Sequence, residues 1–123
     1  MISLKEAIAI QEILIEEFGG SKGIRDRSLL ESAINRPYQT FDNKELYPTS
    51  IEKAAAIIES IVTNHPFIDG NKRVGYVFLR LTIMHDGVDI DASEVSKYQF
   101  VIQIAEGKFK FPEIQNWIIQ NLK

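Results

Sequence analysis

The sequence predicts an all-α protein, a bundle of about six helices that forms a single domain over residues 1–123. Apolar residues recur with helical spacing through most of the chain. Capping residues precede these stretches, and glycine or proline follows them. No case for a main sheet emerges, because the alternation typical of strands is missing. A composition of 45% hydrophobic residues suffices for one compact core.

The first helix is predicted to begin after Ser3 and to end at the glycine pair 19–20. Ser3 and Glu6 have the spacing of a capping box, which satisfies free N–H groups at a helix start. The second helix is predicted to begin at Asp26 and to end at Pro37, because a proline disfavours helical backbone in the residue before it.

The segment Pro37–Pro48 is bracketed by prolines and has no helical face. Aromatic residues stand among polar ones there, so we expect a loop or a short hairpin at the surface. Thr49 and Glu52 have the spacing of a second capping box and predict a helix that continues through Val62.

Three further helices are predicted in the second half of the chain. The first runs from about Asn71 to Gly87, and its apolar width suggests that it is the central helix of the domain. The next takes Asp91 or Ser93 as its N-cap and stops at residues 106–107. The last has Pro112 in its first position, where a missing N–H is tolerated.

Residues 65–73, HPFIDGNKR, interrupt the helical pattern with unusual chemistry. Gly70 allows a ligand to approach the backbone closely. Lys72 and Arg73 fall in the first turn of the following helix, where a cation is unfavourable by about 0.3–1 kcal/mol. The placement makes sense if an anion binds there, because free N–H groups, the helix dipole and two cations then converge on it.

Two more residues add a metal-binding carboxylate and a base to the anion site, and phosphoryl or nucleotidyl transfer uses these three kinds of group. Asp69 lies beside the expected anion site, and Mg²⁺ usually takes one or two carboxylates together with phosphate oxygens. His65 lies across the loop, and histidine is the side chain that exchanges a proton near neutral pH. Each residue alone is more often a turn, a cap or a surface charge, but their grouping within nine positions favours a functional site.

Other classes of site are excluded or disfavoured. Gly70 and Gly75 have the spacing of a P-loop, but Tyr76 and Val77 stand where Lys and Ser or Thr belong. The kinase signatures G-x-G-x-x-G and H-R-D are missing. The chain has no cysteine, and His65 with Asp69 provides too few ligands for zinc.

Charge and hydropathy predict a soluble, cytoplasmic protein. The formal net charge is −3, with both signs mixed, and gives no reason to expect nucleic-acid or membrane-surface binding. The first residues lack the order of a signal peptide, and no apolar run approaches the ~20 residues of a membrane span.

The motif HPFIDGNKR resembles the central signature of the Fic/Doc family, HPFx(D/E)GN(G/K)R. The leading helix that ends in two glycines, the segment IRDRSLLESAINRP and the chain length resemble the death-on-curing (Doc) branch. The resemblance implies an all-α fold with the motif between two central helices, and a flap in Pro37–Pro48 that lays out a target peptide by strand pairing. It also implies residue roles: His65 as general base, Phe67 as an anchor in the core, Asp69 as the Mg²⁺ ligand, and Gly70, Asn71, Lys72 and Arg73 as phosphate ligands.

The Doc branch implies a toxin of a type II toxin–antitoxin system that transfers phosphate from ATP to a protein hydroxyl. The expected target is the translation elongation factor Tu, and the toxin would arrest translation. Many Fic proteins carry an inhibitory helix of pattern (S/T)xxxE(G/N), but Ile102 stands where its Ser or Thr belongs before Glu106. The resemblance therefore implies an antitoxin that acts in trans.

Two alternatives stay open. AMP-transferring Fic proteins continue the motif as GNGRxxR, whereas this chain has Lys72 in place of glycine and Tyr76 in place of the second arginine. Gly70 is nevertheless Fic-like, because Doc motifs can carry alanine there. The other alternative is a protein that binds an anion or an antitoxin without catalysis, but such a protein needs neither His65 nor Asp69.

Overall fold

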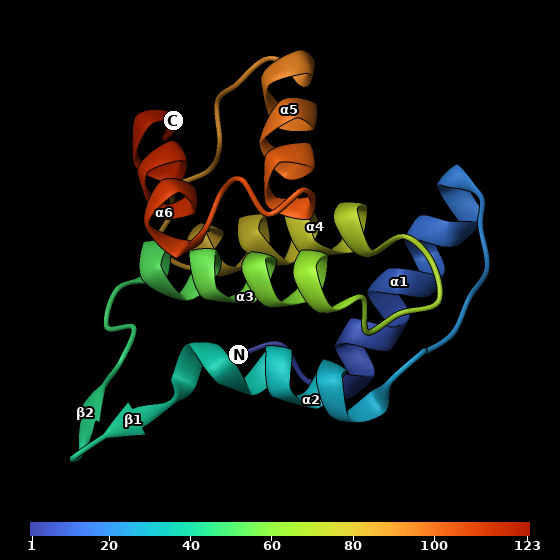
Figure 1. Ribbon diagram of the computed structural model, residues 1–123, viewed down its shortest axis with the longest axis horizontal. Helices are drawn as coiled ribbons and strands as arrows, with labels where there is room; N and C mark the ends of the chain where they lie inside the picture. The colour runs from blue at the N-terminus through green and yellow to red at the C-terminus, as the bar shows by residue number, and fades with distance from the viewer.

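The computed structural model describes residues 1–123 and confirms the all-α architecture (Figure 1). The six helices are α1 (Leu4–Phe18), α2 (Arg27–Asn35), α3 (Ser50–Asn64), α4 (Asn71–Met84), α5 (Glu94–Ala105) and α6 (Phe111–Gln120). A short 3₁₀ helix, η1 (Arg36–Tyr38), and a hairpin of β1 (Thr40–Phe41) and β2 (Lys44–Glu45) connect α2 to α3. No helix has the length and apolar character that crossing a membrane requires.

Side chains cap four of the helices at the predicted residues: Ser3 for α1, Asp26 for α2, Thr49 for α3 and Ser93 for α5. The cap at Thr49 is only half of the predicted capping box. Its hydroxyl oxygen accepts from the Glu52 N–H at 3.2 Å, but the Glu52 carboxylate bonds the Thr49 hydroxyl rather than its backbone N–H. The backbone N–H of Thr49 therefore has no partner in the protein and is left to solvent.

The most central helix is α3, and the prediction that the helix of residues 71–87 holds this place is wrong. α3 packs against α2, η1, α4, α5 and α6, whereas α4 ends at Met84 and leaves both Leu81 and Met84 exposed. The small side chains of residues 54–56, three successive alanines, are fully buried and let neighbouring helices approach α3 on several sides.

The core consists of two clusters, both of which include residues of α3 and α4. One joins α3 and α4 to α5 and α6, and the other joins them to α1 and α2. Phe67, in the α3–α4 connection, belongs to the second cluster and is 1% exposed. The connection that carries the motif is thus tied to the core by its own aromatic side chain, which limits how far its backbone can move.

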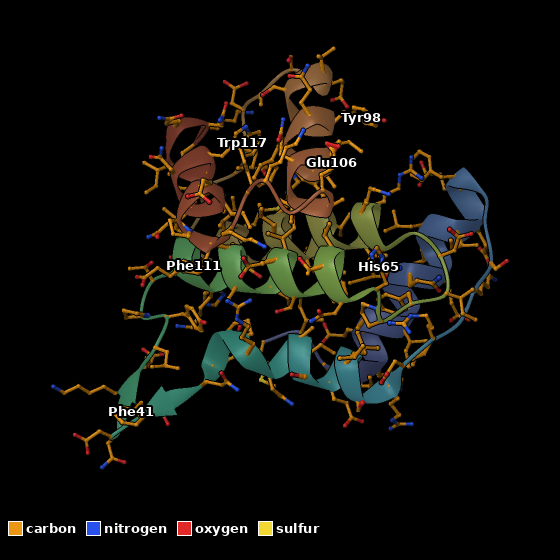
Figure 2. All side chains as sticks on the ribbon, in the orientation of Figure 1. Phe41, His65, Tyr98, Glu106, Phe111 and Trp117 are labelled. Carbon is orange, nitrogen blue, oxygen red and sulfur yellow. The ribbon has the colours of Figure 1, made fainter.

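The hairpin forms as predicted, but it lies far from the motif. Its strands pair antiparallel, and residues 42–43 make the turn in left-handed backbone conformation. The hairpin precedes α3 and His65 follows it, so the 15 residues of α3, about 22 Å of helix, separate the two. Figure 2 shows Phe41 and His65 at opposite ends of the molecule. In this structure, the hairpin is not placed to lay out a peptide at His65.

An ion pair between α4 and the segment that follows it makes stability depend on pH. The guanidinium of Arg80 donates to Asp89 from Nε at 2.9 Å and from Nη2 at 2.6 Å. These hydrogen bonds lower the pKa of the Asp89 carboxyl from 3.8 to about 2. Because the pKa is lower in the folded state, the pair stabilises the fold above about pH 4, and this contribution is lost as the pH falls towards 2.

We expect Asp89→Asn to lower the free energy of unfolding by about 1 kcal/mol at neutral pH, a modest effect because the Arg80 side chain is 42% exposed. The difference should shrink as the pH falls below 4. Urea unfolding at a series of pH values measures it, with Asp91→Asn as the control for an exposed carboxylate. A difference that stays the same from pH 7 to pH 2.5 would contradict the assignment.

Candidate active site

His65 is the C-cap of α3 and has left-handed backbone angles, φ 51° and ψ 59°. Such angles are uncommon outside glycine and need support from the surrounding structure. Arg25 provides it by donating from Nε to the His65 carbonyl at 2.6 Å and from Nη2 to the Asn64 carbonyl at 2.7 Å. The arginine also places a cation at the negative end of the helix. The His65 side chain is consequently held at the surface, facing solvent.

The segment between α1 and α2, residues 19–26, braces the motif from outside. Ile24 and Phe67 form an isolated antiparallel bridge, and the Ile68 N–H donates to the Gly23 carbonyl at 3.0 Å. The N–H groups of Arg25 and Asp26 both donate to the Pro66 carbonyl, at 2.8 and 3.0 Å. We refer to residues 19–26 as the brace. Sequence reasoning missed it, because nothing local indicates that this connection pairs with residues forty positions later.

Gln11 joins the brace to the motif from inside the protein. Its side chain, 1% exposed, donates to the carbonyls of Ser21 and Asp69 at 3.1 and 3.2 Å and accepts from the Gly23 N–H at 3.3 Å. A buried amide is stable only when its polar atoms are bonded in this way. In the sequence, only the presence of a glutamine on the apolar face of α1 indicated a special role. That observation did not show which groups the glutamine would bond.

The Asp69 carboxylate is held in place by two backbone groups. Its Oδ2 accepts from the Ser21 N–H at 3.2 Å, and its Oδ1 accepts from the Gly70 N–H at 3.1 Å. Gly20 lies against it so closely that a Cβ there would be 2.8 Å from Oδ2. No group of three or more metal-ligating side chains occurs anywhere in the structure. Asp69 is therefore not part of such a group.

Gly70 and Asn71 shape the start of α4. Gly70 is its N-cap, with φ 76°, and provides no side chain to cap the helix. Asn71 faces inward and is 8% exposed; its Oδ1 accepts from the Phe67 N–H at 2.9 Å and its Nδ2 donates to the Phe67 carbonyl at 3.0 Å. The Asn71 side chain thus clamps the loop through both its oxygen and its amide nitrogen, and its backbone N–H is left for an anion.

Lys72 and Arg73, in the first turn of α4, are exposed and border a groove of about 570 Å³. His65, Asp69 and Gly70 line the same groove, so the structure brings the predicted site residues together. The opposite wall comes from α5, through Glu94, Lys97, Tyr98, Val101 and Ile102. Sequence reasoning did not assign α5 to the site; Figure 2 shows Tyr98 on this helix, on the same side of the molecule as His65.

Two basic side chains in the groove have no acidic partner. Lys97 pairs with Glu94 at 3.2 Å, whereas Lys72 and Arg73 take part in none of the ion pairs of the structure. Tyr76 also lines the groove, and burial raises the pKa of its hydroxyl from 10 to about 12. The buried hydroxyl oxygen has no hydrogen-bond partner. The groove can therefore attract a group with negative charge.

Comparison with known proteins gives the family of the chain. The family model described as Fic/DOC family matches residues 1–83, which include the brace and the whole motif. A curated protein named Toxin Doc, from Mycolicibacterium smegmatis, is 37% identical over 75 residues. That match covers 61% of this chain and 58% of the relative, so the two are compared over little more than half of the relative's length. The family match spans well over half of the chain and contains the motif. The chain therefore belongs to the Fic/DOC family.

Proposed function

We propose that this protein is the toxin of a toxin–antitoxin system and that it transfers a phosphate group from ATP to a hydroxyl of a target protein. The observation that carries the proposal is the pair of unpaired cations, Lys72 and Arg73, in the same groove as His65 and Asp69. The similarity to the relative named Toxin Doc supports the role as a toxin. We take elongation factor Tu as the expected target and an antitoxin acting in trans as the expected partner.

The start of α4 fits the phosphates of ATP. The first N–H groups of a helix have no partners within the helix, and its positive end favours an anion. Lys72 and Arg73 add two charges on the same turn, and each hydrogen bond from a charged donor contributes about 1.5–3 kcal/mol. The groove continues to the α5 wall, which leaves space beyond the phosphates for the nucleoside.

Asp69 fits a magnesium ion that is bound together with ATP. Two backbone N–H groups orient its carboxylate, and Mg²⁺ in nucleotide sites takes one or two carboxylates with phosphate oxygens and water. Bound there, the ion would neutralise negative charge on the phosphates.

His65 is the proposed general base. It accepts the proton of the target hydroxyl, whose oxygen then bonds to the γ-phosphorus of ATP. The bond between the γ-phosphorus and the β–γ bridging oxygen breaks, and ADP leaves with the electron pair. The imidazolium afterwards returns its proton to solvent or to ADP. The exposed imidazole is accessible to a large protein substrate, as this step requires.

The contact between Gly20 and Asp69 provides a test of the carboxylate's role. We expect Gly20→Ala to weaken Mg²⁺-dependent ATP binding by about tenfold or more, because the new Cβ would lie 2.8 Å from Oδ2 and displace it. The Cβ would also lie 2.9 Å from Ile15 Cδ1, at the end of a flexible side chain. Gly19→Ala is the matched control: Gly19 also has a positive φ, but a Cβ there meets nothing within 4 Å. Both variants should lose about 1–3 kcal/mol of stability from backbone strain. Titration calorimetry with and without Mg²⁺ separates the effects, and equal losses of affinity in the two variants would contradict the role of Asp69.

Transfer of AMP rather than phosphate is the second candidate, and Gly70 favours it. Two residues oppose it. Lys72 occupies a position where the AMP-transferring pattern has glycine, and Tyr76, in place of the second arginine, contributes only a buried neutral hydroxyl to the groove. A reversed nucleotide that presents its γ-phosphate is therefore the preferred pose.

Intact-mass spectrometry decides between these reactions. The protein is incubated with ATP, Mg²⁺ and elongation factor Tu, and the mass of each protein is then measured. A gain of one phosphate on elongation factor Tu supports the proposal, and a gain of one AMP supports the alternative. No gain on any protein of a cell extract, with the folded protein present in excess, would favour a binding protein without catalysis.

A further inference from the structure

We propose that Phe18, the last residue of α1, is a positioning residue that holds the Arg73 guanidinium in place for a phosphate group. This inference rests on the proposed phosphate site and names a residue outside the motif that prepares it. Arg73 Cζ lies 3.9 Å from the centroid of the Phe18 ring. That distance is well within the range of cation–π attraction. The ring is 52% exposed, although a large apolar side chain gains little by lying at the surface.

The contact with the Phe18 ring leaves the donors of Arg73 without a hydrogen-bond partner in the protein. A guanidinium carries five N–H groups in its plane, whereas an aromatic ring contacts its face. Arg73 forms no ion pair or side-chain hydrogen bond, and its guanidinium lies over the Phe18 ring. The contact therefore restricts the rotamers of the side chain without occupying the groups that would bind a phosphate.

The end of α1, which carries Phe18, is attached to the motif independently of Arg73. The end of α1 is attached to the motif by contacts of its own, since Gly20 packs against Asp69 and a Cβ at Gly70 would lie 3.3 Å from the Ile15 side chain. Figure 1 shows the end of α1 beside the α3–α4 connection. The backbone of Phe18 is thus placed next to the first turn of α4, where its ring can contact Arg73.

Lys72, one residue earlier on the same turn, has no such support. Both cations border the groove, but only Arg73 has an aromatic partner that restricts its side chain before a ligand arrives. Ordering a long side chain at the moment of binding opposes binding, and a contact made in the free protein removes part of that cost. Phe18 accordingly raises affinity for a phosphate without touching the ligand.

Binding measurements on the full chain test this role, with ATP–Mg²⁺ and with pyrophosphate as separate probes. We expect Phe18→Leu to weaken binding of both probes by about two- to fivefold. Phe18→Trp should restore wild-type affinity. Phe41→Leu, the same change at an exposed phenylalanine on the hairpin, is the matched control and should leave affinity unchanged. In an Arg73→Ala background, Phe18→Leu should have no further effect.

Each outcome bears on the inference. Unchanged affinity in Phe18→Leu, or an equal loss in the Arg73→Ala background, would overturn it and leave the proposed function standing. If the wild type binds pyrophosphate but not ATP–Mg²⁺, the proposed function fails, while the pyrophosphate series still decides the role of Phe18. A wild type that binds neither probe would overturn both.

Discussion

Replacement of His65 by alanine is expected to lower the rate of transfer by about 10²–10⁴-fold while the protein stays folded. The side chain is exposed, so its removal creates no cavity. Its backbone remains in the left-handed region, which alanine tolerates little worse than histidine, and Arg25 still bonds the carbonyl of residue 65. We therefore expect a change in unfolding free energy of less than about 1 kcal/mol.

The measurement is the initial rate of phosphate transfer by the purified variant, with growth arrest as a second readout. His85→Ala is the matched control, because His85 is the other histidine of the chain and lies at the C-cap of α4, the far end of that helix from the groove. Transfer at the wild-type rate by folded His65→Ala protein would show that another group is the base. Equal losses in the two variants would point to a general effect of losing a histidine.

Replacement of Lys72 by alanine is expected to change ligand binding far more than stability. Without a ligand, Lys72 opposes the dipole of α4, so its removal should leave the protein as stable as before, within about 0.5 kcal/mol. With ATP and Mg²⁺ present, the variant loses a charge-assisted contact of about 1.5–3 kcal/mol, which corresponds to a loss of affinity of about 10- to 150-fold.

Melting curves with and without ATP–Mg²⁺ separate the two effects, because a ligand that binds only the folded state raises the melting temperature. Lys5→Ala is the matched control. Lys5 is also exposed and occupies the second position of a helix, α1, but it borders no groove of this site. If Lys72→Ala strongly destabilises the empty protein and leaves the ligand-induced shift unchanged, Lys72 is structural and the proposed phosphate site is wrong.

Local patterns predicted the helices and the identity of the motif well. The caps at Ser3 and Asp26 and the glycines and prolines at helix ends act over three or four residues, so their effect can be followed in the sequence. The motif likewise placed His65, Asp69 and the two cations near one another, since nine consecutive residues cannot lie far apart. The sequence by itself therefore determined the fold class and most residues of the candidate site.

Tertiary structure alone decided how those residues are held. The brace, Gln11 and Arg25 act on the motif across forty to sixty positions, and such contacts leave no periodic signal in either partner. The same holds for the wall provided by α5 and for the ring of Phe18 beside Arg73. The broad apolar face of α4 suggested that this helix is the central one. Burial on several sides depends, however, on how many helices pack around a segment. α3 has more neighbouring helices than α4 and is therefore the most central helix.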